Sequence, residues 1–500
     1  MPFSRFCRKA ATATTPTSSV IPRSRKLDHH FSGTLSFKGC IFSFAFDGKR
    51  LSLFPLVQEE KESIEYTWLK EEIKPGVFAG PRFPEVDTDY LTGTRNEDGH
   101  TIVFLVNKRS RVSYTLSLKH IVLYVRVHAY IDRKYERNSI CKVSFSCPEI
   151  NLIHPANQAF ELKLNPDEWS KRGKASITST DFDASQTSKR LFRFKEAEVA
   201  TYFAISRSVG DGINHPAIAF TSNLVFEFKP TNNFRFICEL CFAAEQFIQY
   251  LCYRTNIRFS EIKLSAPYND GTTEPFATMH LLWQPEESES RAIEKRRLIG
   301  QSHIEGREGV ILEAISSGAL YMRHIPPSYS QSNQITPASF LMLVAAFEWE
   351  FDRIHPEGIT KSDARINAEN HAEEKINNLI DESSGKEKDI YRFLRKLIRN
   401  DSLKDKFKEI ENDVVPSIGK IGQALYKREG IDFNFVRIGE RIASQRNAFA
   451  HGNLSKSFNK DTLVDIGFLK IIVYAMQLKN IGLDDGAIRN AIEQLFGVSG

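Results

Sequence analysis

The spacing of apolar residues changes at one place in the chain, and this change most constrains the fold. Before Ile325, short runs alternate apolar and polar residues, as in Ile121–Ile131, where every second residue is apolar. After Asn333, apolar residues recur three and four positions apart. A period of two indicates strands with one buried face, and a period near 3.6 indicates amphipathic helices. The sequence therefore predicts an α+β multidomain protein, with a β-rich N-terminal module of antiparallel strands followed by an all-α helical bundle.

Residues 31–325 form the predicted β-rich module. Asp47-Gly48 has the composition of a tight hairpin turn between two of its strands. The predicted strands are Phe31–Phe37, Ile41–Phe46, Leu51–Phe54, Ile121–Ile131, Phe276–Trp283 and Gly309–Met322. Asn233–Tyr253 has the 3.6 period instead, so the module contains at least one helix. Whether these residues form one subdomain or two is left open by the sequence.

Residues 326–334 are predicted to be a linker, because two prolines are followed by small polar residues. Thr336-Pro337 then has the composition of a helix start, with a hydroxyl at the N-cap and proline at the first helical position. Helical repeats follow at Ile390, Phe393, Leu394 and Leu397 and at Leu403, Phe407 and Ile410, while Leu463–Leu478 is apolar nearly all round. Residues 335–500 are therefore predicted to be a helical bundle with short connections.

Length and composition limit the class of protein. Five hundred residues exceed what one hydrophobic core usually holds, so two or three domains are expected. The formal charge of +5 permits a nucleic-acid partner without requiring one. Seven cysteines without regular spacing favour a reducing compartment. No apolar run approaches the length of a membrane span. We expect a cytoplasmic protein with no membrane partner.

Residues 1–30 differ from the rest, because they are basic, rich in Ser and Thr, and contain no acid before Asp28. This composition fits an organellar transit peptide, a disordered tail or an over-extended start. The segment has no amphipathic helical period, which favours a disordered basic tail.

Arg446-Asn447-Ala448-Phe449-Ala450-His451-Gly452 combines groups that can cleave a phosphodiester. Arginine stays charged and grips phosphate with paired hydrogen bonds. Histidine exchanges protons near neutral pH. In this hypothesis Arg446 holds the non-bridging oxygens, His451 moves the proton and Asn447 orients the phosphate or sugar. RNA supplies its own 2′-hydroxyl nucleophile, so the hypothesis favours an RNA substrate and needs no metal or other cofactor.

The spacing of Arg446 and His451 prevents them from being neighbours on one helix face. Five positions correspond to about 140° around the axis and about 7.5 Å along it. Two solutions are open. Either the helix ends near His451, with Gly452 as a left-handed cap residue, or two copies of the helix meet across a symmetry axis and share a composite site.

Simpler explanations exist for these and other residues. An Arg and a His near a helix end can merely solvate that end and balance its dipole. Arg437 and Arg441 either extend an RNA-binding path or form a solvated helix face. Cys238 and Cys241 form a single C-x-x-C, which zinc would need to complete with two more ligands, so buried hydrophobic cysteines are the favoured interpretation.

The motif Arg446-Asn447-x-x-x-His451-Gly452, late in a helical region of about 165 residues, resembles the R-N-x-x-x-H signature of HEPN domains. The layout of the chain is similar to that of the ApeA family of bacterial anti-phage proteins. That family joins a β-rich N-terminal domain, often beginning with a G-x-L strand as in Gly33-Thr-Leu35, to a C-terminal HEPN domain.

The resemblance implies a metal-independent endoribonuclease of abortive infection, with catalytic sites formed in a homodimer or higher homo-oligomer. It transfers catalytic roles to Arg446, Asn447 and His451 and to no other residue. The β-rich module would then restrain the nuclease until a trigger, such as a phage-derived one, arrives. Some HEPN domains are inactive and serve as dimerisation or nucleotide-binding modules, and the motif leaves that alternative open. An enzyme within the N-terminal module is a third possibility, which no motif supports.

Overall fold

The computed structural model describes residues 29–57, 61–62, 64–65, 68–81, 85–108, 110–116, 121–213, 216–285, 289–398, 400–452 and 457–500. The predicted basic tail lies outside these residues except for its last two positions. The described chain forms two compact units. One comprises the residues up to 85 with 94–99 and 111–126, and the other comprises 86–93, 100–110 and 127–500.

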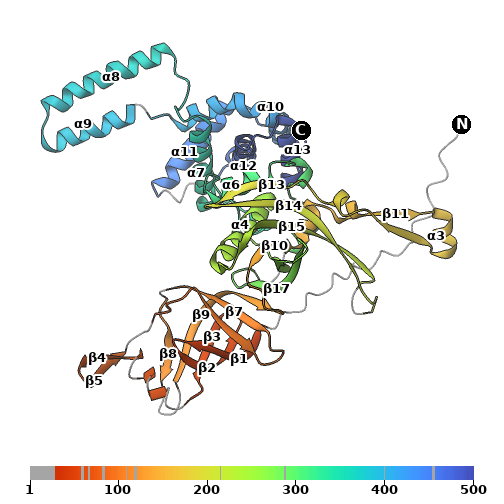
Figure 1. Ribbon diagram of the computed structural model, residues 1–500. Helices are drawn as coiled ribbons and strands as arrows, with labels where there is room; N and C mark the ends of the chain where they lie inside the picture. Colours follow the sequence, from red (N-terminus) through yellow and green to blue (C-terminus); the bar gives the residue numbers. More distant parts are fainter. Residues whose placement is uncertain are drawn as a thin grey trace. The chain divides into compact units, whose positions relative to one another are not determined.

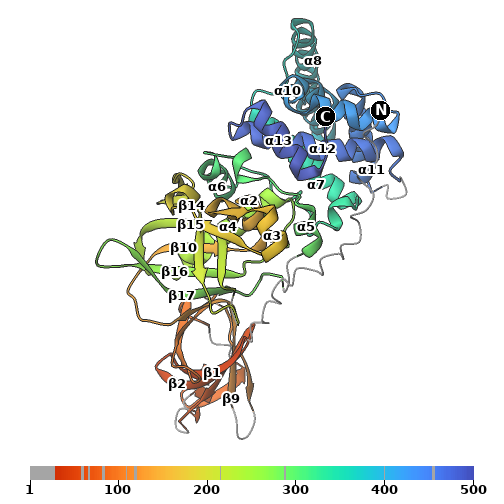
Figure 2. The same cartoon turned by 90° about the vertical axis from the view of Figure 1, so that its right-hand side faces the viewer.

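Six strands of the N-terminal region close into a barrel, which confirms its β-rich character (Figures 1 and 2). In the order of their pairing they are β1 (His30–Phe37), β2 (Cys40–Asp47), β3 (Arg50–Pro55), β9 (Ile121–Arg133), β7 (Thr101–Val106) and β6 (Tyr90–Arg95). A further strand, β8 (Ser113–Leu116), pairs with β9, and β4 (Lys70–Lys74) and β5 (Val77–Pro81) form a separate hairpin.

The barrel interior explains the alternation in the sequence. On β1 and β2 every second residue is buried, and the buried side chains are mainly phenylalanines such as Phe42 and Phe44. Gly33 also points inward. A Cβ at this position would collide with the carbonyl oxygen of Thr94 and the ring of Phe44, so the strand requires glycine there. The Asp47 side chain accepts hydrogen bonds from two following amides, which confirms the predicted turn between β2 and β3.

The larger unit contains an antiparallel sheet covered by helix α4. The strands follow the order β13 (Arg190–Phe194), β14 (Ala197–Val209), β15 (Ile218–Thr231), β10 (Ile140–Ser146), β16 (Glu261–Pro267), β17 (Thr273–Leu281). The predicted helix is α4 (Phe234–Cys252), and its buried residues recur at helical spacing. Short helices α2 (Pro148–Ile153) and α5 (Ser290–Lys295) and an arm of β11 (Phe160–Leu164), α3 (Pro166–Arg172) and β12 (Ala175–Ser179) complete the region.

The predicted strand at Gly309–Met322 was wrong. Residues Glu308–Ser316 form helix α6, which packs against α4 and β13. Ile311, Leu312 and Ile315 are buried while Val310 is exposed, a pattern that follows a period of 3.6. The short apolar run was compatible with both structures, and contact with the neighbouring helix selects the helical one.

Residues 335–500 are helical, as predicted. The helices are α7 (Pro337–Ile354), α8 (Asp363–Glu382), α9 (Gly385–Ile398), α10 (Leu403–Glu429), α11 (Phe435–Ala450), α12 (Lys460–Asn480) and α13 (Asp485–Phe496). Thr336 caps α7 and forms a capping box with Ser339. From Ile471 to Leu478 every side chain of α12 is buried, which confirms its place in the middle of the bundle. Within the described residues, no helix is both long and apolar enough to cross a bilayer.

The segment predicted to be a linker is fixed against the rest of its unit. The amides of Thr255 and Asn256, just after α4, donate to the carbonyls of Pro326 and Pro327. Tyr474 of α12 stacks on Tyr250 of α4 at 5.1 Å between ring centroids and donates to its carbonyl oxygen. These bonds explain why residues 127–500 form one compact unit, a division that differs from the predicted boundary at 326–334.

The apolar repeat at Ile390–Leu397 lies on a helix, but this face is not covered. Helices α8 and α9 form an antiparallel hairpin that extends from the other helices (Figure 1). Ile380 is the one residue of the hairpin that is buried. The bundle core therefore consists of α7 and α10–α13.

Candidate active site

Helix α11 carries the Arg-Asn-x-x-x-His motif and is firmly seated in the bundle. It begins at Asn434, whose side chain accepts the amide of Arg437. Its buried side chains recur at helical spacing and face α7, α10 and α12: Phe435, Ile438, Ile442, Gln445 and Phe449. The Phe449 ring meets Phe340 of α7 edge to face, with 6.0 Å between centroids. The last turn of α11 is therefore anchored directly beside the motif.

The helix ends where the motif predicts. His451 is the C-cap residue, with φ −90° and ψ 14°, and its amide donates to the carbonyl of Asn447. Gly452 follows with φ +77°, in the left-handed region, and its amide donates to Phe449. His451 is exposed at this end. The first of the two geometric solutions, a helix terminus at His451, is thus present in the single chain.

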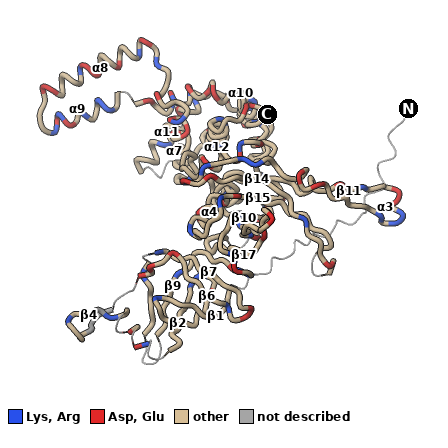
Figure 3. The backbone as a smooth tube through the Cα atoms, in the orientation of Figure 1, with Lys and Arg blue, Asp and Glu red and all other residues tan. Residues whose placement is uncertain are grey.

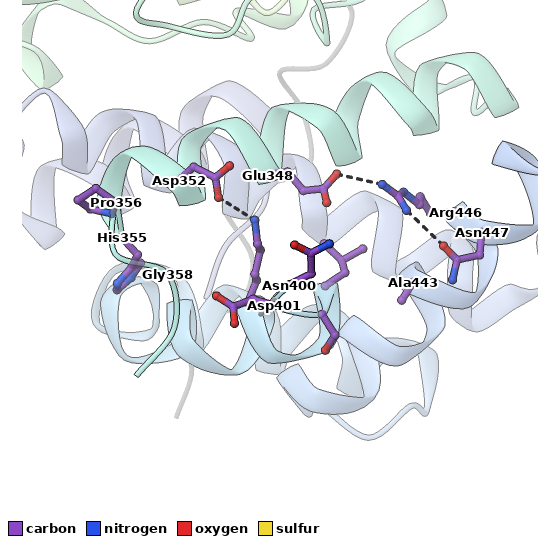
Figure 4. Close-up of a pocket in the computed structure, with 13 residues that line it drawn as sticks. Glu348, Asp352, His355, Pro356, Gly358, Asn400, Asp401, Ala443, Arg446 and Asn447 are labelled. Atoms are coloured by element: carbon purple, nitrogen blue, oxygen red, sulfur yellow. Dashed lines mark hydrogen bonds and ion pairs between the residues drawn. The ribbon is translucent and has the colours of Figure 1, made fainter. Parts of the chain in front are cut away.

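Arg446 and Asn447 line a cavity of about 600 Å³ between α7, α10 and α11 (Figure 4). The lining comes from four parts of the chain: Glu348 and Asp352 of α7, His355, Pro356 and Gly358 after it, Asn400–Leu403 and Lys406 at the start of α10, and Ala443, Arg446 and Asn447 of α11. Arg446 points toward Glu348 of α7, and the Asn447 amide points toward Arg446 (Figure 4). His451 is not among the lining residues, so one chain does not bring all three motif residues to one cavity.

The charges in the cavity are paired. Arg446 Nη2 lies 3.7 Å from Glu348 Oε2, and Arg446 Nη1 donates to Asn447 Oδ1 over 3.3 Å. Lys406 Nζ lies 2.7 Å from Asp352 Oδ1. The Arg446 and Glu348 side chains are 43% and 33% exposed. A long, partly exposed pair of this kind stabilises a protein by about 0–1 kcal/mol. A phosphate could therefore replace Glu348 as the partner of Arg446 at little cost.

Two cavity residues have chemistry that the sequence did not indicate. His355 Nε2 lies 2.9 Å from Asp413 Oδ2 of α10, and Glu348 faces Arg446 as described. Neither stands in a recognisable pattern, because their partners are about 60 and 100 positions away.

Arg441, one of the two arginines suggested to bind RNA, is held inside the bundle. Its Nε and Nη2 atoms lie 2.6 and 2.7 Å from the two carboxylate oxygens of Asp465 on α12, which is fully buried. Tyr426 also donates to this carboxylate, at 2.6 Å. Burial raises the pKa of Asp465, and the guanidinium opposes that rise. Arg441 therefore joins α11 to α12, and its geometry favours a structural role over contact with RNA.

Arg437 is the other suggested RNA-binding arginine. Its side chain is exposed, and it lies 3.4 Å from Asp432, also exposed. An exposed pair of opposite charges is typical of a solvated helix face. Arg437 precedes the cavity-lining residues of α11, and contact between Arg437 and RNA stays a prediction.

The C-x-x-C pair lies within helix α4 and is buried. Burial raises the pKa of Cys238 to about 12 and that of Cys241 well above its ordinary value. Cys241 packs against Met279, with 3.5 Å between the sulfur atoms. The two thiols behave as small apolar side chains. Across the described parts of the chain, no group of three or more His, Cys, Asp or Glu residues is placed to hold a metal ion.

Comparisons with known proteins did not identify a relative. No protein-family model matches the chain, and no curated protein or solved structure matches it. The case for a function therefore depends on the motif and the geometry of α11.

Proposed function

We propose that the chain is a metal-independent endoribonuclease of the HEPN type, acting in anti-phage defence and cleaving RNA at a site completed by a second copy. In this mechanism Arg446 binds the non-bridging oxygens of the scissile phosphate. His451 takes the proton from the 2′-hydroxyl or gives one to the leaving 5′-oxygen. Asn447 orients the phosphate or the sugar. The 2′-oxygen forms the new bond to phosphorus as the bond to the 5′-oxygen breaks.

One observation supports the proposal most strongly. The end of α11 directs Arg446 and Asn447 into a cavity, while His451 ends the helix outside the lining of that cavity with an exposed ring. Within one chain, His451 is therefore not placed at the cavity that Arg446 and Asn447 line. A second α11, related by a two-fold axis, supplies an exposed His451 beside the arginine of the first. The β-rich module then acts as the sensing or regulatory part, and the activity belongs in the cytoplasm, where RNA is present.

A second function fits the charges of the cavity. Glu348, Asp352 and Asp401 place three carboxylates among the lining residues, against Lys406 and Arg446 as permanent cations. Such a lining does not attract a polyanion by itself. A bundle that serves only for dimerisation has no need of that attraction. This alternative predicts no RNA cleavage under any condition.

The test compares cleavage of total RNA by the purified full-length chain and by Arg446→Ala and His451→Ala, each in EDTA. We expect the wild type to cleave, both variants to lose at least about a hundredfold in rate, and cells expressing the wild type to stop growing. Arg428→Ala is the matched control for arginine, because its exposed side chain lies away from the cavity on α10. His30→Ala on β1, an exposed residue far from α11 in the sequence, is the control for histidine.

The outcomes separate the two functions. Cleavage that persists in His451→Ala contradicts the catalytic role of that residue. Cleavage that EDTA abolishes contradicts the metal-free mechanism. A wild type that neither cleaves RNA nor arrests growth, even in cells infected by phage, supports the non-catalytic alternative.

A further inference from the structure

The helical hairpin of α8 and α9 lacks a core of its own. Over its 20 and 14 residues, Ile380 alone is buried. Two helices that bury so little apolar surface gain little stability from each other, since most helix stability in proteins comes from packing an apolar face. The hairpin therefore has an apolar surface that a partner would bury.

The apolar stripe of α9 points away from α8. Arg395 donates to Asn377 of α8 over 3.0 Å, so the Arg395 side of α9 faces its neighbour. At 100° per residue, Phe393 and Leu397 lie about 160° around the helix from Arg395, and Ile390 about 140°. The stripe of Ile390, Phe393, Leu394 and Leu397 is between 40% and 61% exposed. It is a continuous apolar face directed into solvent.

The charges of the hairpin are divided between its helices (Figure 3). Helix α8 carries six acidic and two basic residues: Asp363, Glu369, Glu373, Glu374, Asp381 and Glu382 against Arg365 and Lys375. Helix α9 carries five basic and two acidic residues: Lys386, Lys388, Arg392, Arg395 and Lys396 against Glu387 and Asp389. The hairpin as a whole has no excess of positive charge. An RNA or an anionic bilayer would meet the acidic helix beside the basic one, so neither fits this surface.

We propose that the α8–α9 hairpin binds the same hairpin of a second copy of this chain. A two-fold axis places the basic α9 of each copy beside the acidic α8 of the other, because an isologous interface presents each surface twice. Each α9 stripe, which points away from α8 of its own copy, is then buried against α8 of the other copy. Charged residues flanking an apolar seam set the choice and orientation of the partner, as in coiled coils.

This inference goes beyond the proposed activity. It names the surface that brings two copies together, and it stands whether or not they cleave RNA. Its test is therefore the mass of the protein in solution, measured without RNA, so that a failure here and a failure of the cleavage test are recognised separately.

The first experiment measures the mass of the full-length protein by sedimentation equilibrium. We expect a dimer, and we expect Phe393→Glu with Leu397→Glu to weaken it by roughly 30-fold or more, as for central residues of an interface. The matched control is Val209→Glu with Ile213→Glu, two exposed apolar residues at the tip of the β14–β15 hairpin. A monomeric wild type overturns the proposal, and so does a dimer that survives the α9 substitutions. Binding of the monomer to phosphatidylserine vesicles or to RNA would then identify the other class of partner.

The second experiment exchanges the charges. Glu374→Lys with Asp381→Lys makes α8 less acidic, and Arg392→Glu with Lys396→Glu makes α9 less basic. Each double variant alone should dimerise more weakly, because like charges then face each other. An equimolar mixture should recover the dimer, since each helix meets one of opposite charge. Both variants remaining monomeric in the mixture contradicts the proposed pairing of α8 with α9 of the second copy.

Discussion

Helices α9 and α10 carry the same apolar repeat but have different surroundings. Phe407 and Ile410 of α10 are fully buried, and the Phe407 ring stacks on Phe347 of α7 with 4.3 Å between centroids. Phe393, the phenylalanine of the α9 repeat, is 61% exposed. The difference shows that a period of 3.6 reports an apolar face without reporting what covers it. Within one chain α7 covers α10, whereas the face of α9 is left for another molecule.

The stability of the protein should depend very differently on α9 and on α10, and the largest difference should appear when their phenylalanines are replaced. Phe407→Ala should lower the free energy of unfolding by about 3–5 kcal/mol, because it leaves a cavity in the core. Phe393→Ala should cost less than about 1 kcal/mol in dilute protein, where the second copy is absent. Urea unfolding of both variants measures the contrast. Equal costs would mean that α9 packs on its own chain.

A second contrast concerns two arginines of α11. Arg441→Ala should lower the free energy of unfolding by about 3 kcal/mol, because it leaves the buried Asp465 carboxylate without its cation. Arg437→Ala removes an exposed pair and should change it by less than about 0.5 kcal/mol. If Arg441 served RNA rather than the bundle, its removal would weaken RNA binding while leaving the urea midpoint unchanged.

The smallest expected contrast in stability is between two glycines with positive φ. Gly452→Ala and Gly430→Ala, at φ +77° and +72°, should each cost about 1 kcal/mol. Only Gly452→Ala should also slow RNA cleavage, because the conformation of Gly452 sets the backbone direction directly after His451. Thermal unfolding and an RNA cleavage assay together check this. Equal loss of cleavage in both variants would point to general destabilisation.

The sequence predicts much of the fold where local patterns decide it. Alternation predicts β1, β2 and β9, helical spacing predicts α4, the Thr336-Pro337 start predicts α7, and an apolar run predicts α12. In these elements one face or all faces are buried within the chain. The prediction fails for α6, where a short apolar run suits both structures. The sequence also does not show that the carbonyls of Pro326 and Pro327 accept backbone hydrogen bonds from the residues after α4. Proline and small polar residues occur in fixed loops as well as in linkers.

Only those residues of the candidate site that are close together in the sequence could be predicted. Arg446, Asn447, His451 and Gly452 are close in sequence, and their spacing left a helix end near His451 as one of two solutions, which is the end that the structure shows. Glu348, His355 and Lys406 reach the cavity from α7 and α10, and only the fold brings them there. The internal pairing of Arg441 was not predictable either, because Asp465 is 24 positions away on another helix.

The central claim, that two copies share one site, is tested most directly by mixing inactive variants. Arg446→Ala and His451→Ala are co-expressed with different tags, the mixed dimer is isolated by both tags, and its RNA cleavage in EDTA is measured. A composite site predicts that one of the two sites in each mixed dimer regains Arg446 from one chain and His451 from the other. Cleavage should then return to about half the wild-type rate. Mixed dimers no more active than either variant alone would contradict the claim and place both residues in sites of a single chain.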